Sequence, residues 1–171
     1  MRESLMKAEE ELKRTGADIK LVERDNLHFT VKFLGEVPDS SADEVDRRIK
    51  GLTLKKMEVG VRGLGAFPDA RRPRVVWAGV SPQDSTAITS NGQQVIDALE
   101  RIGENDQRGF HPHITLARVR SPRNLDALVT VLRDNSNRDF GRTAITALKL
   151  KSSVLTPNGP TYRDVREYAL E

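Results

Sequence analysis

The feature that most constrains this sequence is a short pattern that occurs twice, half a chain apart. His28-Phe29-Thr30 and His113-Ile114-Thr115 each place an imidazole, an apolar residue and a threonine in succession within a chain of 171 residues. Both copies lie in runs of apolar and β-branched residues, which favour strands. Because alternate residues of a strand face the same side, each histidine should share a face with its threonine. One such pattern is ordinary strand sequence, but two copies that use two of the three histidines predict a two-histidine active site.

Hydrophobic periodicity around these copies predicts an α+β chain in which the same order of elements occurs twice. We expect helices over residues 1–14, 41–50, 85–102 and 122–133, and strands over 19–22, 27–34, 54–65, 75–80, 113–119, 144–155 and 162–170. Each half then contains a motif strand, a helix and two strands. The prediction is a duplicated two-lobed fold, with antiparallel sheets lining a central cleft and helices on the outside. Residues 1–171 would form a single domain whose two pseudo-symmetric lobes bring the histidines face to face.

Local signals predict several details of these elements. The apolar stripe of the first helix leaves Glu9 on its polar face. Ser41 opens the second helix with capping-box spacing to the glutamate that follows it. Ser121 stands before a proline and is expected to cap the last helix. Residues 134–138 are predicted to be a polar connection and residues 157–160 a turn.

Composition excludes several classes of function. The chain has no cysteine, which excludes disulfides, thiolate metal sites and cysteine nucleophiles. No apolar run approaches the roughly 18–20 residues of a membrane-spanning helix, and residues 1–20 lack the apolar core of a signal peptide. We therefore expect a cytoplasmic protein, without a membrane partner, that acts as a monomer.

The charge balance permits an anionic partner without requiring one. There are 28 Lys and Arg residues against 25 Asp and Glu, which gives a net charge of +3 and a pI near 9.3. The positive charge is most concentrated at Arg71, Arg72 and Arg74, in a stretch that also contains two prolines. This loop is a candidate contact for an RNA phosphate backbone, and the alternative, a solvated loop without a function, stays open.

Two histidines beside two hydroxyls suit phosphoryl chemistry. An imidazole has an ordinary pKa near 6.5, so a neutral and a protonated ring can coexist near neutral pH. Such a pair can activate a nucleophile and protonate a leaving group in one step. The hydroxyls of Thr30 and Thr115 can donate hydrogen bonds to a phosphate oxygen. Arg118, which follows His113 by five residues, adds a permanent charge that fits phosphate. The residues predict a phosphate site that needs no metal and no cofactor.

Five stretches resemble the 2H phosphoesterase superfamily and, within it, the RNA 2′,3′-cyclic phosphodiesterases, historically called 2′-5′ RNA ligases. They are residues 27–36 (LHFTVKFLGE), 65–68 (GAFP), 72–80 (RPRVVWAGV), 110–118 (FHPHITLAR) and 157–162 (PNGPTY). The resemblance implies that the chain hydrolyses a 2′,3′-cyclic phosphate, on an RNA end or a small cyclic nucleotide, to a 2′-phosphomonoester. It implies His28 as proton donor to the leaving 3′ oxygen and His113 as proton acceptor from water, and it extends to reversible 2′-5′ ligation and tRNA processing.

The sequence also shows one departure from the family and permits two alternative functions. The family begins with a strand before its first helix, and that strand is not recognisable here. The first alternative is a metal-dependent hydrolase that uses His28, His111 and His113, although no carboxylate stands at a recognisable ligand spacing from them. The second is an RNA-binding module without turnover. Sparse aromatic residues (five Phe, two Tyr and one Trp) disfavour a stacking platform for RNA bases.

Overall fold

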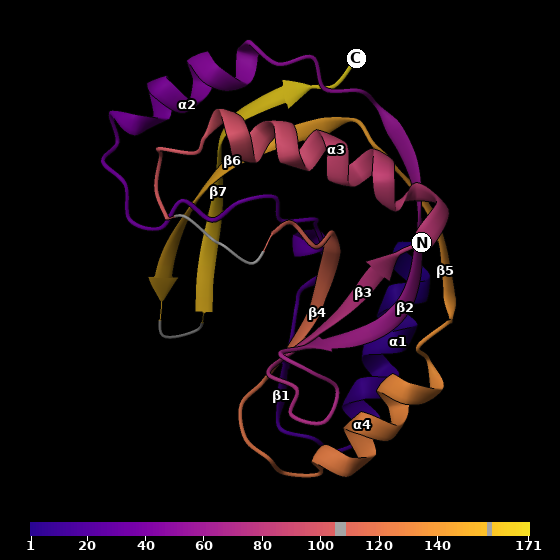
Figure 1. Ribbon diagram of the computed structural model, residues 1–171. Helices are drawn as coiled ribbons and strands as arrows, with labels where there is room; N and C mark the ends of the chain where they lie inside the picture. Colours follow the sequence, from indigo (N-terminus) through magenta and orange to yellow (C-terminus); the bar gives the residue numbers. More distant parts are fainter. Residues whose placement is uncertain (105–108, 157–158) are drawn as a thin grey trace. The chain divides into compact units, whose positions relative to one another are not determined.

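The computed structural model describes residues 1–104, 109–156 and 159–171 (Figure 1). Its helices are α1 (Arg2–Arg14), α2 (Ser41–Lys50), α3 (Pro82–Ala98) and α4 (Leu125–Asp134), with a short 3-10 helix at Arg24–Asn26. Its strands are β1 (Ile19–Leu21), β2 (Met57–Phe67), β3 (Val75–Val80), β4 (His113–Val119), β5 (Asp139–Ile145), β6 (Ala147–Thr156) and β7 (Gly159–Ala169). The predicted α+β class is confirmed. Within the described ranges, no helix is both long and apolar enough to cross a membrane.

The chain divides into two compact units, each assembled from separate segments. The first unit comprises Met1–Thr30, Glu58–Ile88 and His111–Thr143, and the second comprises Val31–Met57, Thr89–Phe110 and Ala144–Glu171. Both His-x-Thr motifs belong to the first unit. The arrangement of the two sequence halves as pseudo-symmetric lobes stays a prediction.

The first unit is built on a five-stranded sheet with the order β1-β4-β3-β2-β5. β4 pairs antiparallel with β1 and with β3, and β3 pairs antiparallel with β2. α1 contacts both β4 and α4. These elements bury a common apolar core that includes Leu5, Leu12, Leu116, Leu128 and Leu132, each of which contributes roughly 1.5–3 kcal/mol of burial free energy. The core therefore occupies one face of β4, and the residues that alternate with it lie on the other face.

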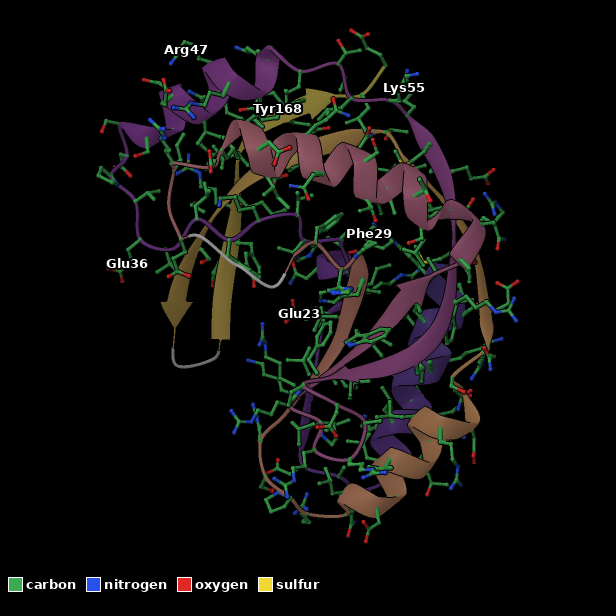
Figure 2. All side chains as sticks on the ribbon, viewed as in Figure 1. Glu23, Phe29, Glu36, Arg47, Lys55 and Tyr168 are labelled. Carbon is green, nitrogen blue, oxygen red and sulfur yellow. The ribbon has the colours of Figure 1, made fainter. Side chains whose placement is uncertain are left out.

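The second unit contains α2, the hairpin of β6 and β7, and the C-terminal part of α3. Apolar side chains of the two helices and the C-terminus form its core: Val45, Ile49, Val95, Leu99 and Leu170. Tyr168 of β7, labelled in Figure 2, is partly buried against this core. The packing of this core holds segments that are far apart in the sequence together as one compact unit.

The first motif is not a regular strand, contrary to the prediction for residues 27–34. The structure gives it an isolated antiparallel bridge between Phe29 and Ile114. After Thr30 the chain belongs to the second unit. There the Glu104 backbone N–H donates to the Leu34 carbonyl at 3.0 Å, and Lys32 Nζ donates to the Glu104 carbonyl at 2.9 Å. These bonds tie the segment to a residue of the loop after α3, and the segment is not part of a strand.

Helix starts also differ from the prediction. α2 is preceded by Ser40, which makes no side-chain capping bond, so the predicted capping box at Ser41 is wrong. α4 begins only at Leu125, after Asn124 with a φ of 52°, and the predicted cap at Ser121 is wrong as well. Asparagine tolerates this left-handed conformation better than most residues. α3 begins earlier than predicted, at Pro82. Proline is tolerated there because the first helical turn needs no N–H from that residue.

The C-terminal strands are divided differently as well. The predicted strand 144–155 is two strands, β5 and β6, and β5 begins directly after the predicted connection 134–138. β6 and β7 pair antiparallel along their length. Of the predicted turn 157–160, residues 157–158 lie outside the described residues, and Gly159 already belongs to β7.

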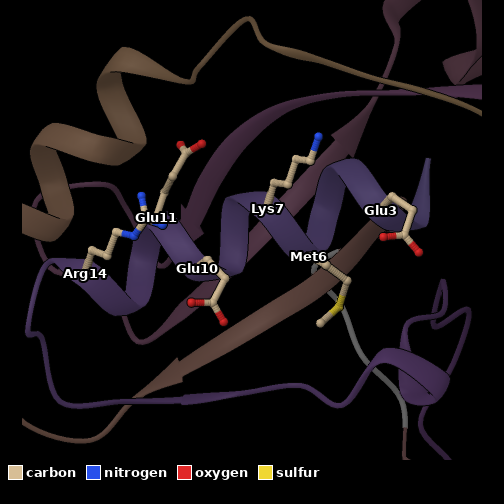
Figure 3. A pocket seen from close by; sticks show the side chains of 6 residues that line it. All are labelled: Glu3, Met6, Lys7, Glu10, Glu11 and Arg14. Atoms are coloured by element: carbon tan, nitrogen blue, oxygen red, sulfur yellow. The ribbon is translucent and has the colours of Figure 1, made fainter.

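α1 buries a carboxylate that the sequence prediction placed on its polar face. Glu9 is 1% exposed, and it lies four residues after Leu5 and three before Leu12, both of which are fully buried. This spacing puts Glu9 in the middle of the apolar stripe. The opposite side of α1 lines an open surface depression of about 410 Å³, with Glu3, Met6, Lys7, Glu10, Glu11 and Arg14 (Figure 3).

Candidate active site

The two motifs meet in a single antiparallel bridge in the first unit. Ile114 is buried in the core at 1% exposure, and its bridge partner Phe29, labelled in Figure 2, packs against the same core. Residues on either side of such a pair face the opposite direction and lie across from each other. His28 and His113 therefore share the face away from the core, and each lies across from the threonine of the other motif.

Both imidazoles are held in the same way by the backbone. His28 Nδ1 lies 2.6 Å from the carbonyl oxygen of Asn26, and His113 Nδ1 lies 2.6 Å from the carbonyl oxygen of His111. A carbonyl oxygen only accepts, so each Nδ1 carries the proton and donates it. This fixes Nε2 as the nitrogen that gains or loses a proton. Thr30 Oγ1 lies 3.1 Å from His28 Nε2.

The surroundings of the two imidazoles differ. His113 is half-buried, whereas His28 is exposed. The ring of Phe67 stands edge to face with the His113 ring, at 4.9 Å between centroids and 80° between planes. The indole of Trp77 lies 6.2 Å from the same imidazole at 55°. Gly79 is the register partner of His113 on β3, so no side chain from that position competes for the space.

This environment makes the two histidines chemically unequal. Burial is the largest effect on His113 and lowers the pKa of its imidazole below the ordinary value. The positive charges of His111 and His28 lower this pKa further. The hydrogen bond to the His111 carbonyl raises it, but not enough to offset the burial. These effects favour the neutral form of His113, which is the form that can accept a proton.

Arg118 shares the face of His113 because of a β-bulge. Strict alternation would turn a residue five positions after His113 toward the core. The register of β4 against β3 shifts by one residue at Leu116, and such an extra residue reverses the alternation beyond it. As a result His113, Thr115 and Arg118 pair with three alternate residues of β3: Gly79, Trp77 and Val75. Lys20 of β1 lies directly across from Arg118 on its other side.

The three arginines singled out from the sequence lie in the β2–β3 loop of the same unit. The Asp69 carboxylate accepts hydrogen bonds from the backbone N–H groups of Arg71 at 2.7 Å and Arg72 at 3.1 Å. The Arg74 carbonyl accepts a hydrogen bond of 2.9 Å from the last residue of β4. All three side chains are exposed, and residues 69–72 line an open cavity of about 560 Å³. The loop is thereby attached to the end of β4 that carries Arg118.

Sequence reasoning did not assign Phe67 and Trp77 to the site. Their role depends on the register of β2, β3 and β4, which brings Gly65 under the indole. A Cβ at Gly65 would lie 2.3 Å from that ring. A glycine facing the only tryptophan of the chain across a strand pair is the signal that could have found this group.

The third histidine contributes its backbone to the site. Its carbonyl orients His113, and its side chain is exposed. Among the described residues, no three His, Asp or Glu side chains are grouped in a way that could hold a metal ion.

Comparison with known proteins identifies the family. Residues 1–77 match the LigT-like phosphoesterase family. The chain is 36% identical to the RNA 2′,3′-cyclic phosphodiesterase of Aeropyrum pernix, over 95% of this chain and 93% of that protein. The chain belongs to the LigT-like phosphoesterase family.

A second relative and a solved structure extend the likeness. The chain is also 34% identical to the RNA 2′,3′-cyclic phosphodiesterase of Methanothermobacter thermautotrophicus, over 99% of this chain and 92% of that protein. The crystal structure of the protein TT0787 of Thermus thermophilus has a TM-score of 0.71 at 26% identity, and the match covers 99% of this chain and 91% of that one. The resemblance drawn from the sequence is confirmed.

Proposed function

We propose that the chain hydrolyses 2′,3′-cyclic phosphate ends of RNA to 2′-phosphomonoesters, with His28 as proton donor and His113 as proton acceptor. The observation that carries this proposal is the bridge between Phe29 and Ile114, from which the two imidazoles project on one face of a sheet. Each ring keeps Nε2 for proton transfer because Nδ1 is bonded to a carbonyl. The relatives named above, which cover nearly the whole chain, are RNA 2′,3′-cyclic phosphodiesterases.

The base in this mechanism is His113. Its neutral Nε2 takes a proton from water while the water oxygen forms a bond to phosphorus. The asymmetry between the two motifs supports this assignment, because burial lowers the pKa of His113 and so favours the form that accepts a proton. After the step His113 is an imidazolium that still donates to the His111 carbonyl.

The acid is His28. As the bond between phosphorus and the 3′ oxygen breaks, Nε2–H of His28 gives its proton to that oxygen, and the phosphate stays on the 2′ oxygen. The exposed position of His28 leaves its ring accessible to the substrate. Before the step, protonated His28 donates from Nε2 to Thr30 Oγ1, which turns the threonine hydroxyl hydrogen toward another acceptor. A phosphate oxygen of the substrate is the acceptor we assign to it.

Threonine hydroxyls and cations would stabilise the phosphate. Thr30 and Thr115 lie on the face of the two imidazoles and can donate to the equatorial oxygens of the transition state. Arg118 adds a charge that cannot be deprotonated. The exposed Arg71, Arg72 and Arg74 are proposed contacts for the RNA backbone.

The same two histidines would support reversible 2′-5′ ligation. A 5′-hydroxyl would replace water as the nucleophile, lose its proton to His113 and form a 2′-5′ phosphodiester, while His28 protonates the 3′ oxygen. Hydrolysis is favoured wherever water outcompetes the hydroxyl. A monomeric cytoplasmic enzyme acting on RNA ends, tRNA among them, is the setting we propose.

The decisive experiment offers the chain a nucleoside 2′,3′-cyclic phosphate and a short RNA with the same end. We expect a 2′-phosphomonoester from both, identified by phosphorus NMR against 2′- and 3′-phosphate standards. His28→Ala and His113→Ala should each lower turnover by roughly 10²–10⁴-fold. A 3′-phosphate product would mean that the roles, or the orientation of the substrate, are reversed. Tight RNA binding without turnover would favour an RNA-binding module.

A further inference from the structure

The aromatic side chains beside His113 form a group that the proposed chemistry does not yet use. Phe67 and Trp77 lie 5.3 Å apart between ring centroids with planes tilted by 38°. Both are within ring-contact distance of the imidazole, at 4.9 Å and 6.2 Å. The three rings thus form a closed triangle of contacts, and we name Phe67 and Trp77 the aromatic clamp.

The backbone is adapted to this clamp. The indole of Trp77 lies across Gly65, where a Cβ would be 2.3 Å from the ring, and beside Gly79, where a Cβ would be 3.2 Å away. Neither glycine has a backbone conformation that requires glycine; a side chain at Gly65 would collide with the indole, and one at Gly79 would crowd both the indole and the Arg62 carbonyl. The indole Nε1 is buried without a hydrogen-bond partner among the described residues. Ring packing, and not a polar anchor, therefore sets the orientation of the indole.

Two opposing effects act on an imidazole between aromatic rings. Aromatic faces attract a cation and would favour the protonated ring, whereas removal of water favours the neutral ring. The net direction at His113 is a lowered pKa, with burial as the largest cause. A lowered pKa of His113 is the direction that removal of water predicts.

Charged and titratable groups lie on the elements around His113, and on its own strand Arg118 shares its face. His111 precedes it on the chain, and His28 lies on the bridged segment; both lower its pKa. On β2, Arg62 pairs with the glycine that faces His113, but its Nε donates to the Asn137 carbonyl at 3.1 Å. Phe67 is the β2 residue that touches the imidazole itself.

We infer that Phe67 and Trp77 are positioning residues that hold the His113 ring for proton abstraction and shield the part of the ring they contact from bulk solvent. Resting on the function proposed above, this inference explains why two copies of one motif take different roles. The first motif has the same backbone anchor for its imidazole but an exposed ring. The difference between acid and base then comes from β2 and β3, and not from the His-x-Thr pattern.

The test measures the titration of His113 in the free protein by histidine NMR, together with the pH dependence of kcat/KM. In Phe67→Ala, the midpoint of His113 should move up toward the ordinary value of about 6.5. Phe67→Tyr keeps the ring and should restore the wild-type midpoint. Gly65→Ala should act like Phe67→Ala, because its methyl group would lie 2.3 Å from the indole of Trp77 and would displace that ring. The titration of His28 in the same samples serves as the internal control and should move much less than that of His113.

The kinetic readout has a matching sign. A base must be neutral, so a raised midpoint moves the acidic limb of the kcat/KM profile to higher pH. The variants should lose roughly 10- to 100-fold below that limb, as expected when a reacting group is both misprotonated and misplaced, and less on the alkaline side.

Each result separates the clamp from the proposed function. An unmoved His113 midpoint in Phe67→Ala and Gly65→Ala would overturn the inference, and so would an equal activity loss at all pH values. Equal shifts of both histidines would also overturn it, because they would indicate general loosening of the fold. If wild-type protein failed to turn over any cyclic phosphate, the proposed function would fall, while the NMR titration would still decide whether the clamp acts on His113.

Discussion

Replacement of Glu9 by glutamine should stabilise the first unit at alkaline pH. The carboxyl is buried on the core side of α1, and its Oε1 has no hydrogen-bond partner among the described residues. Burial, with a smaller contribution from Glu10, raises the pKa of Glu9 from 4.5 to about 7. The folded state therefore binds this proton more tightly than the unfolded state does.

The sign and size of the effect follow from that difference. The stability associated with the bound proton is fully present below about pH 4.5, the unfolded value, and is lost as the pH rises through about 7. Each pKa unit corresponds to about 1.4 kcal/mol, so the free energy of unfolding should fall by about 3 kcal/mol across this window. Glu9→Gln removes the titration, so its advantage over wild type should be small at acidic pH and approach about 3 kcal/mol near pH 8.

Urea unfolding at a series of pH values measures this directly. The fluorescence of Trp77 is a suitable probe, because the only tryptophan of the chain belongs to the same unit as Glu9. Glu10→Gln, an exposed neighbour on the same helix, is the matched control and should change the pH dependence far less. The reasoning is refuted if Glu9→Gln is less stable than wild type near pH 8, since that would mean a charged carboxylate with a stabilising partner.

Three further outcomes test the site. His111→Ala should be much milder than loss of His28 or His113 in the same turnover assay, because alanine keeps the carbonyl that orients His113; if it were the most damaging of the three, the assignment of the pair would be wrong. Activity should survive an excess of chelator, and abolition with recovery on added zinc or manganese would instead favour a metal-dependent hydrolase. Alanine at Arg71, Arg72 and Arg74 together should weaken oligonucleotide binding and flatten its salt dependence, since phosphate contacts release counterions. An equal loss of activity on a mononucleotide substrate would contradict a contact between this loop and the RNA backbone.

Local pattern predicted the parts of the site that depend on local geometry. The alternation around His113 predicted strand 113–119 with the bounds that the structure gives it, and the two-residue spacing put each imidazole on the side of its threonine. The first motif shows the limit of such reasoning. Residues 27–34 have strand-like composition, but a strand also needs a neighbour, and here that neighbour is reduced to one bridge.

What the sequence did not predict depends on contacts between distant segments. The contact between Phe67 and His113 depends on how β2, β3 and β4 pair in register. Local hydrophobic periodicity does not predict these registers. The spacing of Glu9 from Leu5 and Leu12 would have predicted its burial. The sequence prediction instead followed the general preference of glutamate for water.

The bulge at Leu116 also bears on how related sequences are compared. It makes the separation between the second motif histidine and Arg118 an odd number while both stay on one face of the sheet. A homologue that lacked the extra residue would need its arginine four positions after the histidine to present it on that face, and an arginine five positions on would be buried against the core. An alignment that opens a one-residue gap between Thr115 and Arg118 would therefore be structurally correct. One that forces the spacing to be constant would equate the exposed Arg118 with a core position.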